Sequence, residues 1–68
     1  MRPYDSPNGT VWQYKDVLPT WPQDDVYIVL DRPYRGLRPY LNLMTGEIGN
    51  MSKHSRWNSE STLLAEAT

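Results

Sequence analysis

The run Val26-Tyr27-Ile28-Val29-Leu30 is the clearest strand pattern in the chain, because β-branched and aromatic residues favour strands. Side chains alternate along a strand, so the first, third and fifth would lie on one face and the other two on the opposite face. Both faces are apolar, and a strand of this kind must be covered twice. In a chain of 68 residues, either the sheet curls into a small barrel, or one face meets another subunit or a partner.

A second strand pattern precedes this run. Residues 10–17 alternate, with Trp12 and Tyr14 on one face and Gln13 and Lys15 on the other. The pattern predicts a strand with one aromatic face that can join a core.

Residues 18–25, between these two strands, predict a stiff loop. Pro19 and Pro22 restrict the backbone on both sides of Trp21. The pair Asp24-Asp25 would give this loop an acidic tip.

The segment after residue 37 predicts a β-hairpin, in which residues 38–44 and 47–51 pair antiparallel. The turn Leu43-Met44-Thr45-Gly46 fits type I with Gly46 in the left-handed region, which forms a G1 bulge. Residues 40–47 resemble the central hairpin of WW domains, which carry a similar Tyr-x-Asn-x-x-Thr turn. The chain lacks that family's binding Trp after the turn and its closing Pro, so the resemblance implies a hairpin and no peptide-binding activity.

These patterns predict an all-β (mainly β) fold, either a small curled antiparallel sheet or an SH3-like barrel of about four strands, with the option of a short C-terminal helix. An irregular N-terminal arm at 1–9 precedes a single small β domain at 10–57. The remaining residues, 58–68, form a C-terminal tail or short helix. Within them, Ser59–Ala67 fits a helix that would form only by docking, and a fifth strand or a frayed end is the alternative.

Composition and charge exclude several classes of function. The chain has no Cys, which excludes disulfides, thiolate metal sites and cysteine nucleophiles, and its single His argues against a zinc site. The formal net charge of −1 argues against a protein that coats nucleic acid. Because no apolar run is long enough to cross a membrane and no signal-peptide pattern follows Met1, we expect a cytoplasmic protein without membrane association.

No motif predicts catalysis. His54 lies beside Ser52 and Ser55, but a catalytic triad needs partners that the fold brings together. The pair Asp24-Asp25 is not followed by the pattern of a calcium-binding loop. We therefore expect a protein that is not an enzyme and that uses no cofactor and no metal.

Residues 32–40 carry the most informative side chains. Arg and Tyr are enriched at the hot spots of protein interfaces, and they also suit nucleic acid, where Arg contacts phosphate and Tyr stacks on bases. Pro33 and Pro39 would order the segment before binding. The predicted partner-binding residues are Arg32, Tyr34, Arg35, Arg38 and Tyr40, with a second cluster at Arg56 and Trp57.

We expect Tyr34, Arg35 and Arg38 to be exposed, because the nearest acid, Asp31, can pair with only one arginine. The alternative is a solvated strand edge whose tyrosines pack inward. Trp57 is either an exposed anchor or a plug of the core.

Two functions fit these features. The first is a small protein-binding module or inhibitor that occupies a surface of a larger protein, such as a mobile-element accessory protein that blocks a host machine. The second is a small nucleic-acid-binding β domain that uses Arg contacts and Tyr stacking. A homo-oligomer would also cover the second face of the apolar strand.

Overall fold

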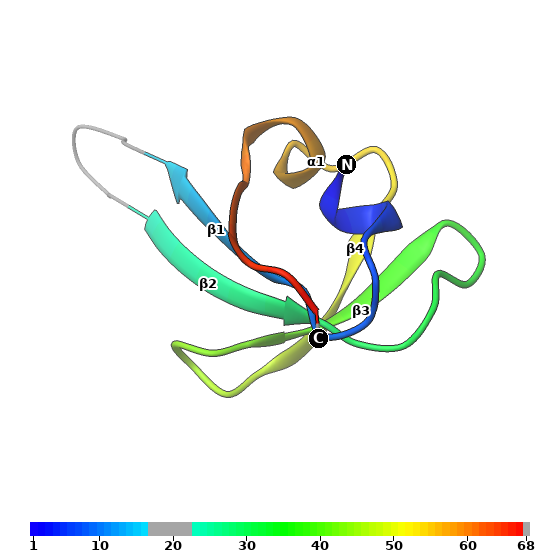
Figure 1. Cartoon of the computed structure of the whole chain (residues 1–68), viewed down its shortest axis with the longest axis horizontal. Helices are drawn as coiled ribbons and strands as arrows, with labels where there is room; N and C mark the ends of the chain where they lie inside the picture. The colour runs from blue at the N-terminus through cyan, green and yellow to red at the C-terminus, as the bar shows by residue number, and fades with distance from the viewer. Residues whose placement is uncertain (17–22, 68) are drawn as a thin grey trace.

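The computed structural model describes residues 1–16 and 23–67 (Figure 1). The elements in chain order are the 3-10 turn η1 (Pro3–Asp5), strands β1 (Val11–Asp16), β2 (Gln23–Val29), β3 (Leu37–Asn42) and β4 (Ile48–Ser52), helix α1 (Trp57–Glu60) and strand β5 (Thr62–Ala65). All described pairings are antiparallel, and the five strands form one sheet in the order β4-β3-β2-β1-β5. The all-β prediction is confirmed as an open sheet, whose edges β4 and β5 do not close into a barrel.

The C-terminal segment differs from the predicted helix over Ser59–Ala67. Helix α1 is a single turn of four residues, and β5 follows it and pairs with β1. A helix of this length is marginal in water, whereas the free edge of β1 offers hydrogen-bond partners for a strand. The predicted alternative, a fifth strand, is therefore the observed one. Neither helical turn of the described residues is long and apolar enough to cross a membrane.

Strand β2 starts earlier than the apolar run predicts. Asp24 pairs with Lys15 across the β1–β2 ladder, and Gln13 Nε2 donates to Asp24 Oδ1 at 2.9 Å. Opposite charges directly across two strands favour pairing, so the predicted acidic loop tip at Asp24-Asp25 is wrong. The rest of the predicted loop, including Trp21, lies outside the described residues.

The inner face of the sheet carries an aromatic core. Trp12 and Tyr14 lie on one face of β1, as their alternation predicts. On β2 the same face continues with Tyr27, the partner of Trp12, and Val29, the partner of Tyr40. Helix α1 and the η1 turn cover this face in Figure 1, which explains why the core includes residues from every layer. The buried apolar side chains are Trp12, Tyr14, Tyr27, Val29 and Met51, with Tyr4, Tyr40 and Trp57 packed against them.

The outer face carries an aliphatic row. Val11, Ile28, Leu41 and Ile48 are register partners on four successive strands. The first three are half-buried, and Ile48 at the edge is 73% exposed. The sheet is open, so it does not cover this face by curling into a barrel. That a second subunit or a partner covers the face stays a prediction.

The β3–β4 hairpin forms as predicted, and Gly46 has a φ of 79°. The predicted type I turn with a G1 bulge is wrong. It requires the Gly46 N–H to donate to Leu43 O, whereas this N–H donates to Asn42 O, one residue earlier, at 2.8 Å. Asn42 Oδ1 also accepts from the backbone N–H groups of Met44 at 2.8 Å and Thr45 at 3.2 Å. The Asn42 side chain thereby satisfies amides that a wider loop leaves free.

We expect Gly46→Val to lower the free energy of unfolding by roughly 1–2 kcal/mol, because a β-branched residue tolerates a positive φ poorly. An added Cβ at this position meets no atom within 4 Å, so the cost is purely conformational. Urea denaturation of the variant measures it, and Gly46→Asn is the matched control because Asn accepts this region. Equal stability of Gly46→Val and wild type would contradict the turn.

Candidate partner-binding site

The structure separates the seven predicted binding residues into three places. The first group lies in the connection between β2 and β3, the second is one buried side chain, and the third surrounds helix α1. In that order they are Arg32, Tyr34 and Arg35, then Arg38, then Tyr40, Arg56 and Trp57.

A tight turn presents Tyr34 and Arg35. The Tyr34 N–H donates to Leu37 O at 2.8 Å, and the Leu37 N–H donates to Tyr34 O at 3.0 Å. The central residues Arg35 and Gly36 have φ angles of 53° and 74°, which make a type I′ turn. Arg35 is the one non-glycine residue with positive φ in the described part of the chain, and this conformation costs about 1–2 kcal/mol.

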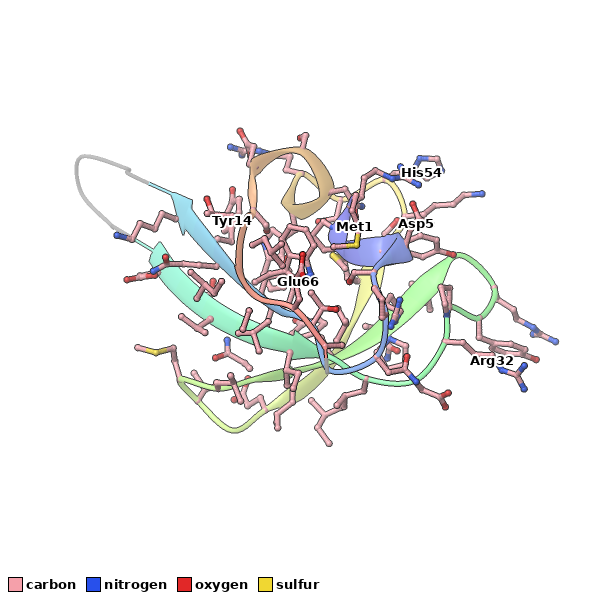
Figure 2. All side chains as sticks on the ribbon, in the orientation of Figure 1. Met1, Asp5, Tyr14, Arg32, His54 and Glu66 are labelled. Atoms are coloured by element: carbon pink, nitrogen blue, oxygen red, sulfur yellow. The ribbon has the colours of Figure 1, made fainter. Side chains whose placement is uncertain are left out.

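The side chains of this turn point away from the core. Tyr34 is 68% exposed, and the Arg35 guanidinium carbon lies 5.2 Å from the centre of its ring. The Lys53 N–H donates to Gly36 O at 3.0 Å, which places a further cation beside the turn. Figure 2 shows Arg32 at the right-hand end of the molecule, below and apart from His54. We call the exposed surface of Arg32, Tyr34, Arg35 and Lys53 the tip surface; none of its cations forms an ion pair with a described residue.

Arg38 does not belong to the tip surface, and the prediction that it is exposed is wrong. Its exposed fraction is 2%. The guanidinium donates to Leu30 O at 2.9 Å, to Tyr4 O at 2.9 Å, to Ser6 O at 2.7 Å and to Asn8 Oδ1 at 2.9 Å. The prediction required a carboxylate, whereas the fold satisfies the guanidinium with neutral oxygen atoms and so fixes the N-terminal arm on the sheet.

One of these bonds replaces a missing bond of the sheet. The Leu30 N–H donates to Pro39 O at 2.9 Å, but proline has no N–H to return to Leu30 O. The Nε of Arg38 supplies that donor. Burial lowers the pKa of Arg38, and the nearby Asp31 and Asp5 act in the opposite direction.

Trp57 plugs the open side of the core. Its ring stacks on Tyr27 with centroids 4.4 Å apart and lies 5.0 Å from the ring of Tyr40. Both Trp57 and Tyr40 are half-buried and pack against the core. Of the two predicted roles of Trp57, plug and exposed anchor, these contacts fit the plug. Arg56 beside it pairs with Glu60, with Nε 2.9 Å from Oε2.

Tyr40 and Trp57 help to line a pocket of about 210 Å³. The sequence interpretation missed its other residues, because Asn, Ser and Met in a polar stretch carry no binding signal. The one residue of the sequence whose type is related to the pocket is Gly49. An added Cβ there would lie 2.6 Å from the Tyr40 hydroxyl, so glycine leaves the room that the Tyr40 ring needs. The pocket is completed by Asn50, Met51, Ser52 and Ser55.

The free energy of unfolding should fall at high pH because of Tyr27. Burial raises the pKa of Tyr27 from 10.0 to about 12, and the hydrogen bond with Ser61 only partly offsets this. Below pH 10 both states keep the proton, so the stability is fully present there. As the pH rises from 10 to about 12, only the unfolded chain ionises, and we expect the free energy of unfolding to fall by up to about 1.4 kcal/mol per pH unit.

Denaturation at pH values on both sides of 10 measures this loss, and Tyr27→Phe is the control because it cannot ionise. The variant should lose less stability over the same interval than wild type. An identical pH profile for the two proteins would show that another group is responsible.

The described residues contain no group of three or more His, Asp or Glu side chains that could hold a metal. The side chains exposed at the β2–β3 turn include cations and an aromatic ring. Comparison of the chain with family models, curated proteins and solved structures finds no match.

Proposed function

We propose that this protein is a small protein-binding module or inhibitor that occupies a surface of a larger partner through the tip surface. The observation that carries the proposal is Arg35, which adopts a costly positive φ of 53° in a turn whose side chains are exposed. Strain at an exposed turn residue whose side chain contacts another exposed side chain, Tyr34, is typical of positions that serve binding.

The composition of the tip surface supports a protein partner. Tyr and Arg are the residue types most often found at binding hot spots, and Tyr34 is already ordered against Arg35 by the cation–π contact. Ordering before binding reduces the entropy that association costs. A partner with an acidic rim around an apolar pocket would complement this surface.

Nucleic acid is the second candidate, and it is favoured by the exposed Arg35 over the Tyr34 ring, with Lys53 beside Gly36 of the same turn and the exposed Arg32 two residues before Tyr34. Cations would contact phosphate and Tyr34 would stack on an unpaired base. Binding of this kind weakens steeply with salt because counterions are released, whereas a largely apolar protein interface does not.

The experiment that tests the proposal uses Arg35→Gly, which keeps the turn and removes the side chain. We expect its free energy of unfolding to be unchanged or raised by up to about 1 kcal/mol, because glycine adopts a positive φ freely. Partner binding should weaken about tenfold or more, since hot-spot residues contribute about 2 kcal/mol. Thermal denaturation and affinity capture from nuclease-treated lysate measure the two effects.

Met44→Ala is the matched control, because Met44 is 64% exposed and lies in the β3–β4 loop, away from the tip surface. A photo-reactive residue in place of Tyr34 should cross-link the same protein that wild type captures. Capture that Arg35→Gly retains in full would show that the tip surface does not bind. Capture that nuclease abolishes would favour the second candidate.

A further inference from the structure

Strand β4 is an edge strand with little of the usual protection, since the following segment covers only its end, where Ser52 O accepts from the Ser55 N–H at 3.0 Å and from Asn58 Nδ2 at 3.2 Å. Edge strands in natural proteins carry charged residues, proline or a covering segment, which prevent pairing with another chain. The sequence of β4, Ile48-Gly49-Asn50-Met51-Ser52, contains neither a charge nor a proline, and among the described strands its one neighbour is β3. An edge of this kind is available for a further strand.

The hydrogen-bond pattern shows which backbone groups of β4 are free. The Asn42 N–H donates to Glu47 O at one end of the β3–β4 ladder, and the Lys53 N–H donates to Gly36 O at the other. In an antiparallel pair the bonded residues alternate, so Gly49 and Met51 face β3. The N–H and C=O groups of Ile48 and Asn50 therefore point away from the sheet.

The pocket beside this edge fits a side chain of an added strand. Asn50 and Ser52 of β4 line the pocket together with Ser55 and Trp57. Tyr40 reaches the pocket because the absent side chain of Gly49 leaves room for its ring. The volume of about 210 Å³ suits one aliphatic or aromatic side chain.

We propose that the β4 edge and this pocket bind an extended segment of a partner protein by strand addition. Backbone bonds to Ile48 and Asn50 would supply affinity, and a side chain in the pocket would supply specificity. This surface adjoins the tip surface at Lys53 and shares no other residue with it, and the inference does not depend on what the tip surface binds.

The flanking charges define the bound segment further. Glu47 directly precedes β4, and Lys53 and His54 follow its end. A segment with an apolar residue for the pocket and an acidic residue toward Lys53 complements this edge. Because the pocket lining is uncharged, a charged side chain there would lose solvation without gaining a partner.

The test selects binders from a phage-displayed library of random short peptides and compares two variants of one residue. Asn50→Pro removes the outward N–H and leaves the β3–β4 ladder bonds in place, whereas Asn50→Ala keeps that N–H. We expect the selected peptides to bind wild type and Asn50→Ala alike, and to bind Asn50→Pro about tenfold or more weakly. Arg35→Gly should bind them like wild type, which separates this inference from the proposed function.

Amide hydrogen exchange of the wild-type protein gives a second readout that does not require Asn50→Pro to fold. Bound peptide should protect the amides of Ile48 and Asn50. Protection confined to β5, the opposite edge, would overturn the proposal, as would selected peptides that bind Asn50→Pro as tightly as wild type. Failure to select any peptide would overturn it too, and so would a wild-type dimer that Asn50→Pro converts to monomer, since the edge would then bind a second copy.

Discussion

A chain with Arg38→Ala should be largely unfolded at room temperature. The variant removes hydrogen bonds to four oxygen atoms, on Leu30, Tyr4, Ser6 and Asn8. Hydrogen bonds to a charged group contribute about 1.5–3 kcal/mol each, and buried acceptors that lose their donor keep their desolvation cost. Even a loss of about 4 kcal/mol approaches the total stability of a small domain.

Circular dichroism and thermal denaturation measure the effect. Arg38→Lys is expected to retain part of the stability, because an ammonium group keeps the charge but lacks the planar fork that contacts several acceptors. Arg35→Ala is the matched control for loss of an arginine from an exposed position. An Arg38→Ala variant that melts like Arg35→Ala would contradict the structural role of Arg38.

Trp57→Ala should have the second largest effect. The indole stacks on Tyr27 at 4.4 Å and contacts the rings of Tyr40 and Tyr14 at 5.0 Å and 5.7 Å. Truncation of a buried aromatic residue costs about 3–5 kcal/mol, and because Trp57 is half-buried we expect about 3 kcal/mol. In this variant, both the melting temperature and the near-ultraviolet circular dichroism signal of the aromatic cluster should be lower than in wild type.

Trp57→Phe keeps a ring in the cluster and should recover most of the lost stability. Tyr34→Ala provides the comparison for an exposed aromatic residue, and surface changes of that kind alter stability by less than about 0.5 kcal/mol. If Trp57→Ala and Tyr34→Ala had equal melting temperatures, Trp57 would be an anchor for a partner rather than a plug of the core.

The sheet could be predicted where a local pattern has one physical solution. Trp12 and Tyr14 alternate with polar residues, so the face of β1 follows from the two-residue period of a strand. Gly46 follows from the turn, because few other residues accept its φ of 79°. The turn residues Tyr34 and Arg35 were also correctly expected at the surface.

The remaining features depend on contacts between distant residues. Arg38 receives its acceptors from Tyr4 and Ser6, which lie 34 and 32 positions away, and no local pattern announces them. Thr62–Ala65 is a strand only because β1 has a free edge, and the residues alone fit a helix equally well. The pocket needs Tyr40 and Trp57 from two different elements, so its shape exists only in the folded chain.

The replacement of a sheet bond by the Arg38 side chain implies that positions 38 and 39 constrain each other. With proline at 39, Leu30 O needs a donor from elsewhere, and Nε of Arg38 is that donor. With a residue that has its own N–H at 39, this particular demand on Arg38 would disappear. Among diverged descendants of this sequence, we therefore expect arginine at 38 to be retained where proline is retained at 39, and to vary more freely where proline has been lost.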